Sequence, residues 1–131
     1  MNFQDELAKT VKDYLGEDLD EKIIKDGHVN IIQGYFEGLR RKIGTVKSQS
    51  YNIVPWSTDS KFLIEDITFN TRVNTENNTI EVTKVIDGKT TPIDTIIVQD
   101  GELIAVNRNE KFTTEILEEY LRETFGEKLG L

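Results

Sequence analysis

Residues 79–107 read TIEVTKVIDGKTTPIDTIIVQDGELIAVN, and the fold class follows from this stretch. Apolar and polar residues alternate along it, which is typical of strands that bury one face. It contains Asp87-Gly88 and Asp100-Gly101, a dipeptide that favours type I′ hairpin turns because both central positions require a positive φ. The stretch therefore predicts three consecutive antiparallel strands at 79–86, 92–99 and 102–107.

The same alternation extends upstream to about residue 50, where Thr, Val and Ile become frequent. It predicts a first strand at 51–56 and a second, long strand at 61–73. A bulge near Glu65-Asp66 would account for the length of the second strand. Consecutive antiparallel strands usually pair with their neighbours, so we expect a five-stranded antiparallel meander sheet.

Two helical regions precede the strands. Apolar residues recur at helical spacing between residues 3 and 15, with Gly16 as a candidate C-terminal cap, which predicts a first amphipathic helix. Asp18 opens a second apolar series that ends near Gly44. Gly27 interrupts this series beside His28, and a kink or break is expected there because Gly destabilises a helix by about 1 kcal/mol relative to Ala.

One helix follows the strands. Thr113 is a candidate N-cap, and the apolar face of the segment that follows predicts a helix ending at Gly126. The whole chain, 1–131, is thus expected to form a single α+β domain. It would have two N-terminal helices, the five-stranded sheet and one C-terminal helix, with the helices packed on one face of the sheet.

The composition of the 131 residues excludes several functional classes. There are 24 acidic and 16 basic side chains, no Cys and one His. Without Cys there is no thiol catalysis, thiolate metal site or disulfide, and an acidic surface repels nucleic acids and anionic lipids. The first residues do not resemble a signal peptide, and no apolar run approaches a membrane span. We therefore expect a cytoplasmic protein that binds neither nucleic acid nor membrane.

The charges are unevenly distributed along the chain. Residues 23–48 carry five basic and two acidic side chains, whereas acidic residues predominate on both sides of this segment. The cations could complement the negative end of a helix dipole or bind an acidic partner. Trp56 is interpreted first as a cap on the core at a strand end, whereas an exposed Trp56 side chain would be a contact anchor. The candidate interaction surface comprises Arg40, Arg41, Lys42, Lys47, Trp56, Glu115, Glu118 and Glu119.

No motif for catalysis, metal binding or cofactor binding is present. His28 is the only imidazole, and it is interpreted as a polar residue at a helix break. Glu65 and Asp66 would point to opposite faces of a strand, which argues against a carboxylate dyad. We therefore predict no catalytic residues, no metal site and no cofactor.

The leading hypothesis is a non-enzymatic protein-interaction module with an unknown protein partner, and a homodimer is one form of it. The alternative is a small-molecule-binding domain, with a pocket between the sheet and the helices lined by residues such as Tyr35, Trp56, Phe62 and Phe69. Two further hypotheses, ranked below these, are a nucleic-acid mimic and a small enzyme that uses carboxylates and His28.

Overall fold

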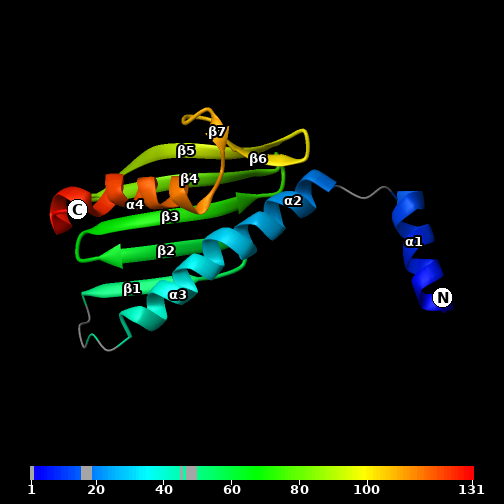
Figure 1. The fold of residues 1–131 in the computed structure, drawn as a ribbon, viewed down its shortest axis with the longest axis horizontal. Coiled ribbons are helices and arrows are strands. Elements are labelled where there is room, and N and C mark those ends of the chain that lie inside the picture. Colours follow the sequence, from blue (N-terminus) through cyan, green and yellow to red (C-terminus); the bar gives the residue numbers. More distant parts are fainter. Residues whose placement is uncertain (1, 16–18, 45, 47–49) are drawn as a thin grey trace.

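The computed structural model describes residues 2–15, 19–44, 46 and 50–131. Within these residues, five helical segments and seven strands follow one another along the chain (Figure 1). The helical segments are α1 (Phe3–Leu15), α2 (Leu19–Gly27), η1 (His28–Gln33), α3 (Gly34–Lys42) and, at the other end, α4 (Thr114–Leu129). The strands are β1 (Tyr51–Pro55), β2 (Asp59–Ile64), β3 (Ile67–Asn74), β4 (Thr79–Ile86), β5 (Lys89–Gln99), β6 (Glu102–Ala105) and β7 (Glu110–Lys111).

The strands form one antiparallel meander in the order β1 to β7. The expected α+β class and antiparallel sheet are confirmed, but the number of five strands is wrong. The predicted strand 61–73 is divided by a turn at Glu65-Asp66, and Ile64 pairs with Ile67 across it. Glu65 adopts a φ of 53°, so the chain reverses where a bulge was expected. A short seventh strand follows the 106–109 turn.

Both Asp-Gly dipeptides occupy the hairpin turns that the sequence predicts. Asp87 and Gly88 have φ values of 53° and 76°, and Asp100 and Gly101 have values of 52° and 77°. Positive φ at both central positions is the requirement of a type I′ turn. These turns set the register of β4, β5 and β6.

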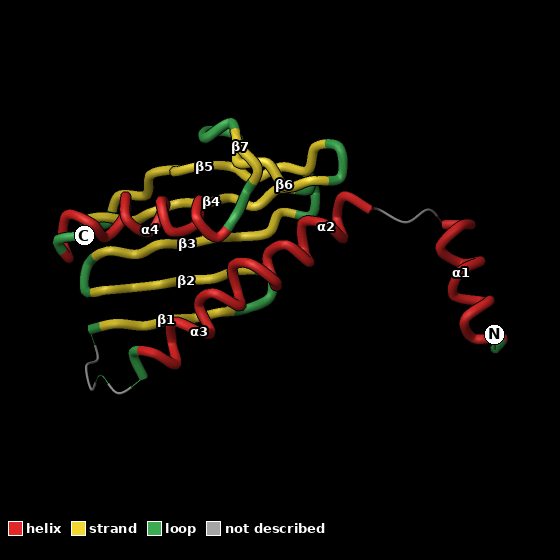
Figure 2. The backbone as a smooth tube through the Cα atoms, in the orientation of Figure 1, coloured by secondary structure: helices red, strands yellow, loops and turns green. Residues whose placement is uncertain are grey.

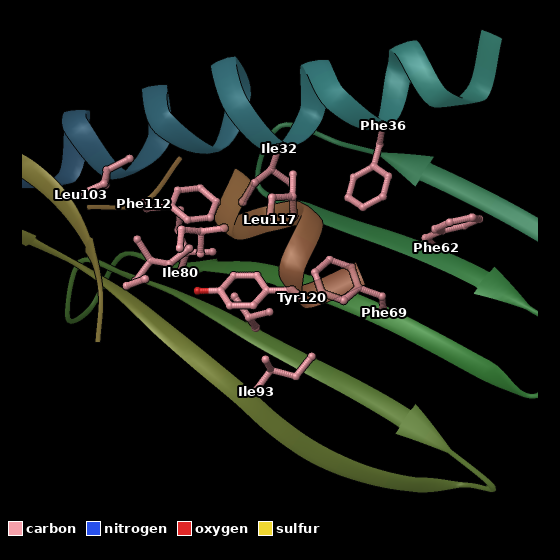
Figure 3. Close-up of a cluster of buried hydrophobic side chains, with 14 of the residues drawn as sticks. Ile32, Phe36, Phe62, Phe69, Ile80, Ile93, Leu103, Phe112, Leu117 and Tyr120 are labelled. Carbon is pink, nitrogen blue, oxygen red and sulfur yellow. The ribbon is translucent and has the colours of Figure 1, made fainter. Parts of the chain in front are cut away.

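The second helical region does not break at Gly27. It continues from Leu19 to Lys42, and the six residues of η1 form a π-helical segment in its middle. This long helix and α4 lie on the same face of the sheet (Figures 1 and 3). The core between the two layers is built from buried aliphatic and aromatic side chains, and the largest fully buried ones are Phe36, Phe69, Tyr120 and Phe125.

The helix α4 begins as predicted but ends later. Thr113 is its N-cap, and the Thr113 side chain accepts a hydrogen bond from the Ile116 amide at 3.4 Å. The predicted end at Gly126 is wrong, because Gly126 is buried within the helix. Gly130, with a φ of 72°, is the left-handed cap that ends α4 after Leu129.

The first helix departs most from the expectation. α1 stands apart from the sheet and from the other helices (Figure 2). Each of residues 3–14 is exposed, so α1 does not pack on the sheet face that α2, α3 and α4 cover. The predicted cap at Gly16 lies outside the described residues. Among the described helices, none is long and apolar enough to cross a membrane.

Candidate interaction surfaces

The helix α1 presents an apolar stripe to solvent. Phe3, Leu7, Val11 and Tyr14 follow one another at helical spacing, and Phe3 and Tyr14 are 73% and 88% exposed. Asp5, Lys9 and Lys12 lie on the opposite side of the helix. Monomeric proteins rarely leave a contiguous apolar surface of this kind uncovered, so α1 is a candidate binding element. We call these four residues the α1 stripe.

A largely apolar groove of about 410 Å³ lies between α3 and α4. The two helices diverge toward the turn that joins β2 to β3, and β2 forms the floor of the groove between them (Figure 1). We call it the α3–α4 groove. Its apolar lining side chains include Tyr35 and Leu39 of α3, Ile43 directly after α3, Phe62 and Ile64 of β2, and Leu121, Phe125 and Leu129 of α4.

The narrow end of the α3–α4 groove is closed by a polar contact. The Tyr35 hydroxyl donates a hydrogen bond to Glu118 Oε2 at 3.1 Å and so links α3 to α4. Partial burial raises the pKa of Tyr35, and the Glu118 carboxylate raises it further, so the phenol remains protonated and can donate. This contact fixes the spacing of the two helices where they approach each other.

The basic residues predicted as a docking site lie in the last turn of α3, where they complement the helix dipole. Arg40 and Arg41 line a second groove, of about 730 Å³, beside β1. Neither these two nor Lys42 forms an ion pair within the described part of the chain. Lys47, the fourth predicted residue, lies outside the described residues.

The acidic residues of α4 are separate from this basic cluster. Glu118 accepts from Tyr35, and Glu119 lies 3.6 Å from Arg108 in the turn before β7. Glu115 is exposed. The structure therefore does not join the predicted basic and acidic surfaces within one chain.

Trp56 follows β1 and is 61% exposed, so the interpretation that it caps the core is wrong. It lies in a groove of about 550 Å³ with Lys61, Asn70 and Arg72, on the sheet face that the helices leave uncovered. Phe62 and Phe69, by contrast, are buried against Phe36, at 6.0 Å between ring centroids in each pair. The residues expected to line one ligand pocket are therefore divided between opposite faces of the sheet.

A buried polar cluster that no sequence pattern indicated lies under η1. His28 is fully buried, its Nε2 lies 2.8 Å from Thr71 Oγ1, and Thr71 Oγ1 lies 2.5 Å from Ser60 Oγ. The expectation of a polar residue at a helix break is thus wrong. All three side chains are sealed between η1 and β2–β3, so the cluster fixes the long helix to the sheet.

The cluster makes stability depend on pH. Burial lowers the pKa of His28, although the Ser57 backbone and the Asp59 carboxylate oppose the shift. As the pH falls below about 6.5, the unfolded chain binds the proton first, so stability present above that pH is lost. We expect the free energy of unfolding to fall by up to about 1.4 kcal/mol between roughly pH 7.5 and 5.5. Denaturant unfolding at both pH values measures this loss, and His28→Gln should abolish it; an equal loss in the variant would contradict the assignment.

Glu65 and Asp66 also differ from their predicted arrangement. They lie in the turn between β2 and β3 and not within a strand, so the alternation of strand side chains does not apply to them. Both carboxylates approach Lys128 of α4, at 3.7 Å and 3.3 Å from its Nζ atom. This exposed pair of contacts joins the turn to the end of α4. Within the described ranges, no group of three or more acidic or histidine side chains is placed to hold a metal ion.

Comparison with known proteins identifies a family for nearly the whole chain. A family model described as "Protein of unknown function (DUF3942)" matches residues 4–129. No curated protein and no solved structure matches the chain. The match begins within α1 and ends in the last turn of α4, so the family includes both the exposed helix and the helix-covered sheet.

Proposed function

The chain belongs to the DUF3942 family, and we propose that it is a non-enzymatic protein-interaction module whose docking element is α1. The observation that carries the proposal is the α1 stripe. Four large apolar side chains share one face of a helix, and no other part of the described chain covers them. An unpartnered apolar helix face is the usual way in which a helix binds a groove on another protein.

The length of α1 supports the same conclusion. The helix has 13 residues, and isolated helices shorter than about 12–15 residues are only marginally stable in water. Most helical stability in proteins comes from packing an amphipathic face against another surface. Docking through the stripe would supply that packing.

The only imidazole of the chain serves the fold. His28 is fully buried under η1 and bonded to Thr71, so it is not available to a substrate. The cations at the end of α3, which form no ion pair with a described residue, and the exposed Glu115 lie apart from α1. They offer further charges that a protein partner could complement. The cytoplasm, predicted from the sequence, is the compartment in which we expect this binding.

A photo-crosslinking residue at position 7 tests the proposal in the full-length chain, in cells of the organism that encodes it. We expect a covalent adduct with a protein, because Leu7 lies in the middle of the stripe. The matched control places the same residue at Lys9, on the opposite side of α1, and should give little adduct. Equal yields from both positions, or none from position 7, would refute the proposed docking element.

A small apolar molecule is the second candidate ligand. The α3–α4 groove has a volume of about 410 Å³ and a mostly apolar lining, within the range of small-molecule sites. Native mass spectrometry of the purified chain distinguishes the candidates. A bound ligand adds its own small mass to that of the chain, whereas a docked protein adds the mass of a whole polypeptide.

A further inference from the structure

The helical layer of the fold is incomplete beside the α3–α4 groove. Leu39, Ile64 and Leu121 are only partly buried there, and Leu129 is 49% exposed. A helix placed between α3 and α4 would cover these side chains and the inner face of β2 beneath them. The chain itself contains such a helix, because α1 has an apolar face against which no described residue packs.

The α1 helix of the same molecule is too short to occupy the groove fully. Tyr35, at its near end, lies about 24 Å along the long helix from Leu19, at ~1.5 Å per residue. The four peptide steps from Leu15 to Leu19 span at most about 14 Å. Even at full extension, Val11 and Tyr14 would stop short of Tyr35, and half of the stripe would remain exposed.

We propose that α1 of one molecule docks in the α3–α4 groove of a second copy, and that the exchange is reciprocal. This inference rests on the proposed function and specifies its partner. A two-fold arrangement uses both stripes and both grooves, so each copy covers the exposed apolar surface of the other.

The surface available is sufficient for a stable dimer. A buried aromatic side chain covers roughly 150–250 Å², so Phe3 and Tyr14 of both copies bring roughly 600–1,000 Å². The grooves contribute a similar area, and the total then reaches the ~1,200–2,000 Å² of specific interfaces. Leu7 and Val11 add to it.

The charges beside the two surfaces are complementary. Glu6 and Asp13 are seven residues apart and border one side of the α1 stripe. Lys42 lies three residues after the groove residue Leu39, on the edge of α3, and has no ion-pair partner among the described residues. An α1 helix seated in the groove would place acidic side chains next to this basic edge.

Pairs of introduced cysteines test the exchange, and the natural chain offers a clean background because it has no Cys. Leu7→Cys is combined with Leu121→Cys in one full-length variant and with Leu39→Cys in another. Under mild oxidation, we expect at least one of them to form mainly a disulfide-linked dimer of twice the 15.0 kDa chain mass on a non-reducing gel. Circular dichroism of each variant verifies that it is folded.

The controls separate the exchange from other contacts. Lys9→Cys combined with either groove variant, and Leu7→Cys alone, should form little disulfide-linked dimer on the same gel. A disulfide within one chain, or no disulfide in either folded Leu7→Cys pair, would overturn the exchange. If crosslinking at position 7 still captured a different protein, the proposed function would stand and only its partner would be wrong.

Discussion

Replacing Asp94 by alanine is expected to lower the free energy of unfolding by roughly 2–6 kcal/mol, a large part of the ~5–15 kcal/mol that stabilises a typical domain. Asp94 is buried in β5, opposite the register shift between Val82 and Thr83. Its carboxylate accepts hydrogen bonds from the Tyr120 hydroxyl at 2.5 Å, the Thr95 amide at 2.7 Å and the Asn107 amide at 2.8 Å.

The loss is large because the carboxylate joins three elements. Tyr120 belongs to α4, and Asn107 belongs to the turn after β6. Burial raises the pKa of Tyr120, and its hydrogen bond to Asp94 raises it further, so the hydroxyl stays protonated and needs an acceptor. Without Asp94, the buried Tyr120 hydroxyl would lose its acceptor, at about 1–3 kcal/mol. The hydrogen bonds from the Thr95 and Asn107 backbone amides would also be lost, at about 0.5–1.5 kcal/mol each.

Denaturant unfolding measures the effect, with Tyr120→Phe as the matched control. Tyr120→Phe keeps the ring that stacks on Phe112 at 6.3 Å between centroids and removes only the hydroxyl. It should cost less than Asp94→Ala, and the double variant should cost less than the sum of the two. A loss below about 0.5 kcal/mol for Asp94→Ala, as for an ordinary surface residue, would contradict the role assigned to the carboxylate.

The hairpins of this fold could be predicted because their signals are local. Asp87-Gly88 and Asp100-Gly101 require no knowledge of the tertiary structure, and both form the expected turns. The turn at Glu65-Asp66 could not be found in this way, since Glu65 is not a preferred turn former and Asp66 is not followed by the Gly that marks the other two turns. Its stability depends on β2 pairing with β3 and on Lys128 of α4, which are distant in sequence.

The functional surfaces were harder to predict for a related reason. Helical spacing identified the α1 stripe but not what covers it, because periodicity shows that a face is apolar and not which surface it contacts. The His28–Thr71 contact joins residues 43 positions apart, so only the folded arrangement reveals it. Whether the Trp56 side chain is buried or exposed could not be predicted, because a residue at a strand end can direct its side chain toward either face of the sheet.

The reciprocal docking of α1 between two copies predicts a second large effect, on the hydrogen exchange of the α1 backbone amides. Burying the four stripe residues contributes roughly 6–12 kcal/mol, at ~1.5–3 kcal/mol for each side chain. Association costs ~4–15 kcal/mol, and a reciprocal dimer bears that cost once for two docked helices. When α1 is docked, its amides should be protected from hydrogen exchange. An undocked helix of this length unfolds frequently, so its amides should exchange rapidly.

The most direct test is therefore amide hydrogen exchange of the full-length chain, with the protection of residues 4–14 compared at high and low protein concentration. We expect α1 to be protected at high concentration and to lose this protection on dilution. In the variant Leu7→Asp, α1 should be unprotected at every concentration. The sheet and α4 should remain protected throughout, which shows that the variant is folded. Rapid hydrogen exchange of the α1 amides at all concentrations in the natural chain would contradict the docking of α1 on a second copy. Protection of α1 that Leu7→Asp does not change would contradict it as well.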